Sequence, residues 1–354
     1  MPVRLVDLIN GYLQKYEWGS LSALAELRGI EASGSPEAEL WFGVHPSGPA
    51  TLEREHGQVP LQQALNEIQE EMPYLVKILA ADQPLSLQAH PNATQASSGF
   101  EDKRSKPEMI CALTWFETLC GFKPVSAALE ICSYLNFASD LLSAMESSGD
   151  FTEVTKSILT QDREEEVAAL LQRCHEAEEE MFSSEISTIK RLAEKYPKDP
   201  ALLLIPMMRK FTLEPGQALF LDPGVLHSYL GGVALEVMGS SDNVVRAGFT
   251  SKPKDPLTLL GIIDFELRPE IQISSSSHHR FKAPTSEFDV EKINESVQVK
   301  DREGTDVVVA ASRETTLTSQ KETLIIQQGS AAWVPLAEGS YEIQTLGTAY
   351  RVVG

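Results

Sequence analysis

The sequence predicts a mainly β protein that carries a helical insert. Three observations carry this prediction: short apolar runs separated by Gly and Pro in the first third, a helical periodicity in the middle, and strand-like alternation with Pro-Gly turns afterwards. The chain has 354 residues. A single hydrophobic core stops growing at roughly 250 to 300 residues, so we expect more than one domain.

The first unit is predicted from buried strands. "YLVKILA" at 74–80 and "MICALTWFETLCGF" at 109–122 are short apolar runs of strand length, and the segment around them is rich in Gly, Pro and aromatic residues. We place this unit at residues 1–124 and continue it over 206–265, where "KFTLEPGQALFLDPGVLHSYLGGVALEVM" again alternates between turns.

A helical insert is predicted between these two parts, at 125–205. Val167, Leu170, Leu171 and Cys174 follow the i, i+3, i+4, i+7 spacing of one helix face, and Pro197 stops the run. Residues 266–354 return to short strands and Gly-containing turns, for example in "TDVVVAASRETTLTSQKETLIIQQGSAAWVPL". We therefore expect a C-terminal β domain there.

The excess of acidic side chains indicates which binding partners the protein can have. The chain has 51 acidic and 30 basic side chains, a formal net charge of -21. Such a field repels the phosphate backbone of a nucleic acid, so we expect no nucleic-acid partner. It also repels a small anionic substrate, which would need its own local cluster of Lys and Arg.

The cysteine pattern and the hydropathy of the sequence predict a cytoplasmic protein. No apolar run approaches the roughly 20 residues of a membrane span, and the first residues lack the apolar region of a signal peptide. The cysteines show no CxxC spacing and no disulfide-rich pattern; they are Cys111, Cys120, Cys132 and Cys174. We expect reduced, mostly buried thiols and no membrane partner.

Four polar residues are candidate metal ligands. In "LSLQAHPN", Gln88 and His90 are two apart, and in a strand side chains at i and i+2 share one face. Taken alone, the pair is better explained by a hydrogen-bonded glutamine and a capping or loop histidine before Pro91. Glu108 opens an apolar run, where a carboxylate is costly unless it is paired or binds a cation, and His227 follows a Pro-Gly turn. Two imidazoles, a carboxylate and an amide oxygen suit zinc, or manganese or cobalt by ligand type.

The stretch around His227 resembles a known motif. Gly216, Pro223, Gly224 and His227 are similar to the second metal motif of the cupins, a double-stranded jelly-roll superfamily. The usual His-x-His is here Gln-x-His, and the acidic candidate lies much further downstream than in most cupins. These departures indicate one family within the superfamily.

The chain resembles type I mannose-6-phosphate isomerase (phosphomannose isomerase), nearly end to end. The motifs that carry the resemblance are "KYEWGS", "AELWFGVHPSGPA", "LVKILAADQPLSLQAHPN", "KPEMICAL", "LHSYLGG" and "LEVMGSSDNVVRAGFTSKPKD", in this order. The resemblance implies a cupin-type jelly-roll catalytic domain at 1–124 and 206–265 and a cupin-like fold at 266–354. It also implies one zinc ion per chain, bound by Gln88, His90, Glu108 and His227.

The resemblance further implies the reaction, interconversion of mannose 6-phosphate and fructose 6-phosphate through a cis-enediol, which connects glycolytic sugar to GDP-mannose biosynthesis. The partner is then a small sugar phosphate, and we expect a monomer. A developing enediolate needs positive charge nearby, and Arg246 resembles the active-site arginine of the family. Lys252 and Ser86 are the implied phosphate ligands, and Trp18 the aromatic residue expected to touch the sugar.

Three residues are candidates for proton transfer or orientation. Lys77 and Lys106 are expected near the metal, where the pKa of a lysine can be lowered. Glu236 is a second carboxylate, expected to carry protons or to orient Arg246. Many relatives carry a His or another polar residue just before K-P-E, where this chain has Ser105, which would not replace it in proton transfer.

Two alternatives remain open. His90, Glu108 and His227 alone would make the two-histidine, one-carboxylate site of an iron-dependent cupin oxygenase. A non-enzymatic sugar-binding or storage cupin would keep the barrel without needing the cations. Gln88 and the Arg246 and Lys252 cluster favour the isomerase over both. The remaining polar and aromatic residues of the motifs are interpreted structurally, His45 as an ordinary turn residue and Trp41 as packing.

Overall fold

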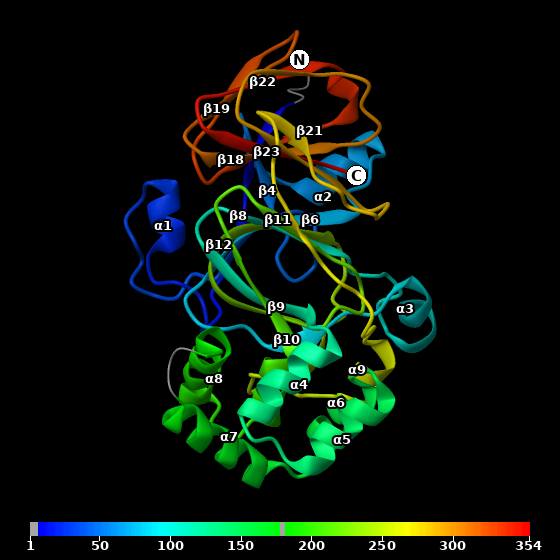
Figure 1. Cartoon of the computed structure of the whole chain (residues 1–354). Helices are drawn as coiled ribbons and strands as arrows, with labels where there is room; N and C mark the ends of the chain where they lie inside the picture. The colour runs from blue at the N-terminus through cyan, green and yellow to red at the C-terminus, as the bar shows by residue number, and fades with distance from the viewer. Residues whose placement is uncertain (1–5, 178–180) are drawn as a thin grey trace.

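The computed structural model describes residues 6–177 and 181–354 and is mainly β-sheet with several helices (Figure 1). The elements form successive layers. Helices cover one end, a large antiparallel sheet forms the middle, and strands from both ends of the chain form the opposite end. Separate hydrophobic cores lie between these layers.

The large sheet of the middle layer has the order β14-β11-β8-β12-β6-β3-β2, and β7, β9, β10 and β13 join it off this path. Its longest strand, β12, pairs with β6 and β8 at one end and with β7 and β9 at the other. The bounds are β2 Tyr12–Gln14, β3 Glu39–Phe42, β6 Tyr74–Ala81, β7 Leu87–Ala89, β8 Glu108–Ala112, β9 Phe116–Phe122, β10 Met208–Leu213, β11 Ala218–Leu221, β12 His227–Gly239, β13 Val245–Gly248 and β14 Ile271–Gln272.

A second sheet packs against the middle layer in the order β15-β16-β23-β18-β21-β1-β4-β5, and a small sheet, β17-β22-β19-β20, covers its other face. The bounds are β1 Asp7–Asn10, β4 Thr51–Arg54, β5 Gly57–Pro60, β15 His278–Arg280, β16 Asp289–Ile293, β17 Val297–Val299, β18 Asp306–Ser312, β19 Thr315–Thr318, β20 Thr323–Ile326, β21 Ala331–Val334, β22 Tyr341–Thr345 and β23 Thr348–Val353. Strands from the start of the chain therefore complete a sheet made mostly by its last part, because β1 pairs with β21.

Most helices lie between β9 and β10, where the helical periodicity was found. In α7 the side chains of Val167, Leu170 and Cys174 are buried and Leu171 is half-buried, so the apolar stripe packs onto the core beneath it. The helices are α1 Ala23–Arg28, α2 Leu61–Ile68, α3 Ala93–Gly99, α4 Val125–Tyr134, α5 Ser139–Ser148, α6 Thr152–Thr160, α7 Glu164–Glu176, α8 Ser183–Lys195, α9 Pro256–Ile262, and the 3-10 helices η1 Pro200–Met207 and η2 Leu336–Glu338.

The cysteines and the helices bear on the expected thiols and on membrane insertion. All four cysteines are free and buried, as their spacing predicted. Within the described part of the chain, none of the helices combines the length and the apolar character that crossing a membrane requires.

The two-residue period of the strands positions polar side chains inside the large sheet. In β6, Val76 and Ile78 point into the core shared with the second sheet, so Leu75, Lys77 and Leu79 point to the opposite side. The same alternation in the neighbouring strands turns their polar residues inward, namely Glu39 in β3, Glu108 in β8 and Glu236 in β12. Four adjacent strands thus direct charged groups to one interior.

Candidate functional site

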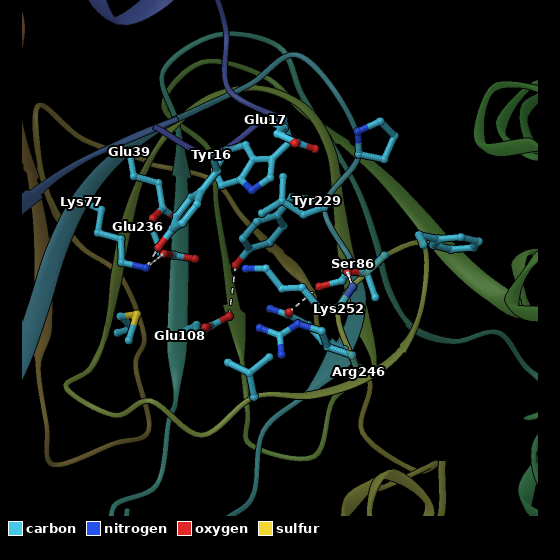
Figure 2. A pocket seen from close by; sticks show the side chains of 18 of the residues that line it. Tyr16, Glu17, Glu39, Lys77, Ser86, Glu108, Tyr229, Glu236, Arg246 and Lys252 are labelled. Atoms are coloured by element: carbon cyan, nitrogen blue, oxygen red, sulfur yellow. Dashed lines mark hydrogen bonds and ion pairs between the residues drawn. The ribbon is translucent and has the colours of Figure 1, made fainter. Parts of the chain in front are cut away.

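A cavity of about 780 Å³ occupies this interior (Figure 2). Apart from His90 and His227, every site residue predicted from the sequence lines it: Trp18, Lys77, Ser86, Gln88, Lys106, Glu108, Glu236, Arg246 and Lys252. These residues come from strands and loops far apart in the sequence, and β-sheet pairing brings them together.

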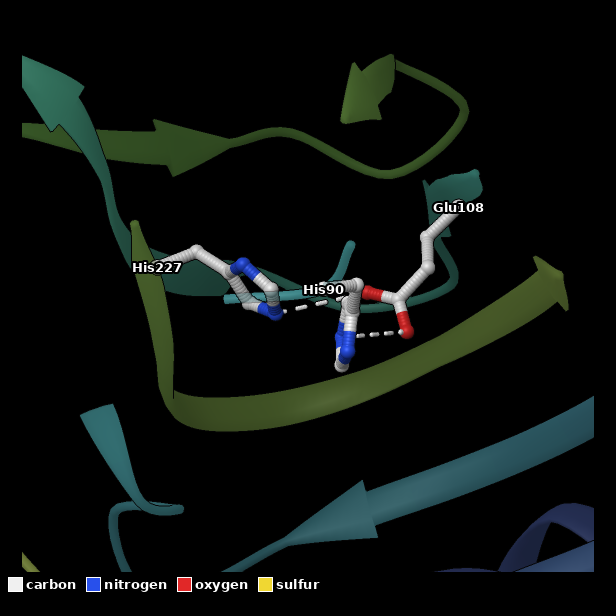
Figure 3. A group of neighbouring side chains, drawn as sticks. All are labelled: His90, Glu108 and His227. Atoms are coloured by element: carbon white, nitrogen blue, oxygen red, sulfur yellow. Dashed lines mark ion pairs between the residues drawn. The ribbon is translucent and has the colours of Figure 1, made fainter. Parts of the chain in front are cut away.

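His90, Glu108 and His227 form a buried cluster, of which Glu108 lines the cavity (Figure 3). One potential ligand atom from each lies within 4.8 Å of the others, and among the described residues this is the one such group of His, Cys, Asp and Glu. His90 Nε2 is 3.1 Å from one Glu108 oxygen, and His227 Nε2 is 3.4 Å from the other. Glu108 opens β8, His227 opens β12, and His90 directly follows β7.

Hydrogen bonds fix the tautomer of both histidines. His90 Nδ1 lies 2.6 Å from the backbone oxygen of Asn243, and His227 Nδ1 lies 2.9 Å from that of Val225. A nitrogen that faces a carbonyl carries the proton, so each Nε2 keeps its lone pair. Neither Nε2 has a hydrogen-bond partner, although both are buried.

The electrostatics of the cluster suit a cation. Burial, and then Lys106, lower the pKa of His90 to about 4, and burial lowers the pKa of His227 as well. Burial alone would raise the pKa of Glu108, but the ammonium of Lys106, 3.0 Å from the carboxylate, holds it well below its usual range. Two neutral imidazoles therefore aim lone pairs at an ionised carboxylate, an arrangement that a divalent metal ion stabilises.

Two further groups hold Glu108 from the cavity side. Lys106 Nζ is 3.0 Å from one carboxylate oxygen, and the hydroxyl of Tyr229 donates to the other at 3.3 Å. Lys106 is itself buried, and it lies where we expected a lysine near the metal. Both contacts fix the direction in which the carboxylate points.

Gln88 lies beside this cluster. Its backbone is directly opposite His227 in β12 and opposite Arg246 in β13, and its side chain lines the cavity. Gln88 Oε1 accepts a hydrogen bond from the Ser86 hydroxyl at 2.8 Å. Ser86 therefore orients the amide, and the ligand role of Gln88 stays a prediction.

A second charged cluster spans three adjacent strands. Lys77 Nζ is 2.8 Å from Glu236 and 3.6 Å from Glu39, and it sits 4.9 Å above the ring of Trp41. The indole N–H of Trp41 donates to Glu39 at 2.8 Å. Trp41 was interpreted as packing only, yet it lines the cavity and fixes a carboxylate.

These contacts correct the expectation of a lowered lysine pKa at Lys77. Burial lowers the pKa of Lys77, but Glu236 and Glu39 outweigh it, so the pKa is raised and the side chain is a fixed ammonium. Burial raises the pKa of Glu236 in spite of Lys77. Glu236 pairs with Lys77 and not with Arg246, so of the two expected roles the geometry favours proton transfer.

The cations at the other side of the cavity have no acidic partner. Arg246 in β13 forms no ion pair with any described residue, and neither does Lys252, whose Nζ lies 5.1 Å from the ring centre of Tyr16. In Figure 2, Arg246 and Lys252 lie on the same side as Ser86. Trp18 stacks on Tyr16 with ring centres 5.7 Å apart. In a chain with net charge -21, two unpaired cations in one cavity are typical of an anion site.

His45 and Ser105, both outside the metal cluster, make contacts that the sequence did not predict. His45 opens a turn, since its carbonyl accepts the Gly48 N–H at 3.0 Å, but it is also buried, it lines the cavity, and its Nε2 lies 3.2 Å from Asp242 Oδ1. Its position inside "AELWFGVHPSGPA" was the available signal. Ser105 donates to Glu287 at 2.9 Å and is not part of the cavity lining.

The amino-acid sequence is similar to known isomerases over most of its length. The family model "Phosphomannose isomerase type I, catalytic domain" matches residues 5–125. The mannose-6-phosphate isomerase of Escherichia coli is 29% identical over 98% of each chain. Mannose-6-phosphate isomerase 1 of Arabidopsis thaliana is 31% identical and covers 79% of this chain and 76% of its own length.

Solved structures of mannose-6-phosphate isomerases share the fold of this chain. A zinc-bound mannose-6-phosphate isomerase superposes with a TM-score of 0.91 at 26% identity, over 99% of this chain and 100% of that chain. A single-residue variant of phosphomannose isomerase from Salmonella typhimurium gives 0.92 at the same identity and coverage. The fold and the cavity thus define the class of protein: the chain is an enzyme, an isomerase. It belongs to the type I phosphomannose isomerase family.

Proposed function

We propose that this chain interconverts mannose 6-phosphate and fructose 6-phosphate with one zinc ion held by Gln88, His90, Glu108 and His227. The observation that carries the proposal is the pair of histidine Nε2 atoms that face the buried Glu108 carboxylate of the cavity and have no hydrogen-bond partner among the described residues. When bound, zinc would supply a Lewis acid or a template for the sugar oxygens.

We also propose that residues 1–124 and 206–265 form a cupin-type jelly roll, with 125–205 as its helical insert and 266–354 as a cupin-like β domain, whose sheet is joined by β1, β4 and β5 of the first segment. The antiparallel pairing of β12 with two sets of strands supports the barrel. We further propose that the enzyme is a monomer and acts in the cytoplasm.

The chemistry assigned to the chain's own residues is a proton transfer. The proton on C2 of the aldose is removed, a cis-enediolate forms, and a proton is delivered to C1, while the hydroxyl proton moves from O2 to O1. Glu236, whose pKa is raised by burial, is our candidate proton carrier, and Lys77 holds it in place. Arg246 supplies a fixed positive charge for the enediolate oxygens.

Lys252 and Ser86 are assigned to the phosphate. We expect Lys252→Ala to raise KM for mannose 6-phosphate roughly 10- to 100-fold, the value of one hydrogen bond to a charged group, and to leave kcat nearly unchanged. Steady-state kinetics measure this split. Lys254→Ala is the matched control, since Lys254 lies on the same loop but pairs with Asp199 at 3.3 Å. An unchanged KM in Lys252→Ala would remove Lys252 from the phosphate site.

The decisive experiment is a coupled assay with mannose 6-phosphate that follows fructose 6-phosphate, before and after a chelator and with zinc restored. We expect turnover to disappear with the chelator and to return with zinc, and manganese and cobalt are compared in the same assay. Folded, zinc-loaded protein without turnover would reject the isomerase proposal. Metal analysis would then distinguish an iron oxygenase from a binding protein.

A further inference from the structure

Two loops next to the metal cluster are joined by one buried side chain. Asn243 lies between β12 and β13, and its side chain is buried. Its Nδ2 donates to the backbone oxygen of Asp102 at 2.7 Å and to that of Arg104 at 2.9 Å. Both N–H groups of the amide are therefore used to hold the segment that leads into Glu108.

The backbone of the same residue holds a ligand. The carbonyl oxygen of Asn243 accepts the Nδ1 proton of His90 at 2.6 Å, which fixes both the tautomer and the ring direction of His90. Asn243 thus connects two of the three buried candidate ligands, because Arg104 is only four residues before Glu108.

Neighbouring contacts keep the two loops close. The Ser241 hydroxyl donates to the backbone oxygen of Arg104 at 3.2 Å, and the Gly239 N–H donates to that of Pro107 at 3.0 Å. A Cβ atom at Gly239 would lie 3.1 Å from the Ser105 backbone oxygen, so the two loops are in close contact there. A shift of the Asn243 carbonyl would therefore be transmitted directly to the metal cluster.

We propose that Asn243 is a positioning residue: its side chain clamps the 102–104 segment and thereby fixes the carbonyl that orients His90 for zinc. Asn243 does not line the cavity, although Asp242 and Val244 on either side of it do, so it acts without touching the substrate. The inference rests on the proposed zinc site. Removal of a group that orients a metal ligand typically weakens metal affinity 10- to 100-fold.

The test measures zinc affinity by competition with a chromogenic chelator, together with the melting temperature of the metal-free protein. Asn243→Ala should weaken zinc binding about 10- to 100-fold. Asn243→Asp keeps the shape but sets a carboxylate oxygen against two carbonyls, so it should lose at least as much affinity. Tyr74→Phe is the matched control, because the buried Tyr74 hydroxyl also contacts two backbone carbonyls, of Thr305 and Val352. It should destabilise the protein and keep its zinc affinity.

The outcomes separate the two proposals. Wild-type protein that binds no zinc would reject the proposed metal site itself. Zinc affinity that is unchanged in both Asn243 variants, or equally weakened in Tyr74→Phe, would overturn the role of Asn243. Long-range ¹H–¹⁵N NMR spectra of the metal-free wild type need no variant: His90 should be protonated at Nδ1, and protonation at Nε2 would overturn the inference.

Discussion

Replacement of His227 by alanine is expected to remove zinc and turnover together. His227 Nε2 is buried and faces Glu108 at 3.4 Å, and no hydrogen bond from the described part of the chain uses its lone pair. Without this ligand the remaining donors would release the ion, and the stabilisation that a metal gives to developing negative charge would be lost. We expect kcat/KM to fall by roughly 10³-fold or more, a barrier increase of at least about 4 kcal/mol.

The measurement combines zinc content after dialysis with steady-state kinetics. His278→Ala is the matched control, because His278 also lies beside a glutamate, Glu291 at 3.2 Å, but it is exposed and lies on β15. The control should keep both zinc and activity. A His227→Ala protein that binds zinc with wild-type affinity would show that His227 is not a ligand.

The parts of the site that depend on local sequence could be predicted. A carboxylate at the head of an apolar strand is costly unless it is used, and this reasoning found Glu108. The Pro-Gly turn before His227 predicted the start of a strand, and β12 begins at His227. The shared direction of Gln88 and His90 stays a prediction, because Gln88 lines the cavity and His90 follows the end of β7. The helix stripe at Val167 and Leu170 was likewise a local pattern, and those residues are buried.

Contacts between distant strands could not be predicted in this way. The pKa of Lys77 depends on Glu39 and Glu236, which reach it only because β3, β6 and β12 are neighbours in the sheet. A lysine in an apolar strand is compatible with either direction of shift until its partners are known. The contact of His45 with Asp242 was missed for the same reason, since Asp242 lies on a loop far along the chain.

The sheet that the first strands join could not be predicted from the sequence either. The start of the chain contributes β1 and β4 to a sheet that is otherwise made mostly by residues after 277. Nothing in "DLIN" or "TLER" indicates which of the two sheets the strand joins, because both sequences fit a half-buried strand. Which sheet a short strand joins is decided by long-range packing.

Replacement of Arg246 by alanine is expected to reduce kcat strongly while zinc content stays unchanged. Arg246 lines the cavity, is the ladder partner of Gln88 in the neighbouring strand, has no acidic partner among the described residues, and is not one of the clustered ligands. A fixed donor aimed at developing oxyanion charge is typically worth 10²- to 10³-fold in kcat, about 2.7–4 kcal/mol. We expect a loss of that size, measured by steady-state kinetics beside metal analysis.

Arg246→Lys separates charge from shape. The lysine keeps a positive charge but loses the planar, multiply donating guanidinium, so it should recover only part of kcat. If Arg246 instead held the ground-state substrate, the alanine variant would raise KM and leave kcat near wild type, because binding that is equal in ground and transition states does not change kcat. Near-normal kcat in Arg246→Ala would therefore move the stabilisation of the enediolate to other cations of the cavity, of which Lys77 and Lys106 are already paired with carboxylates and Lys252 is assigned to the phosphate.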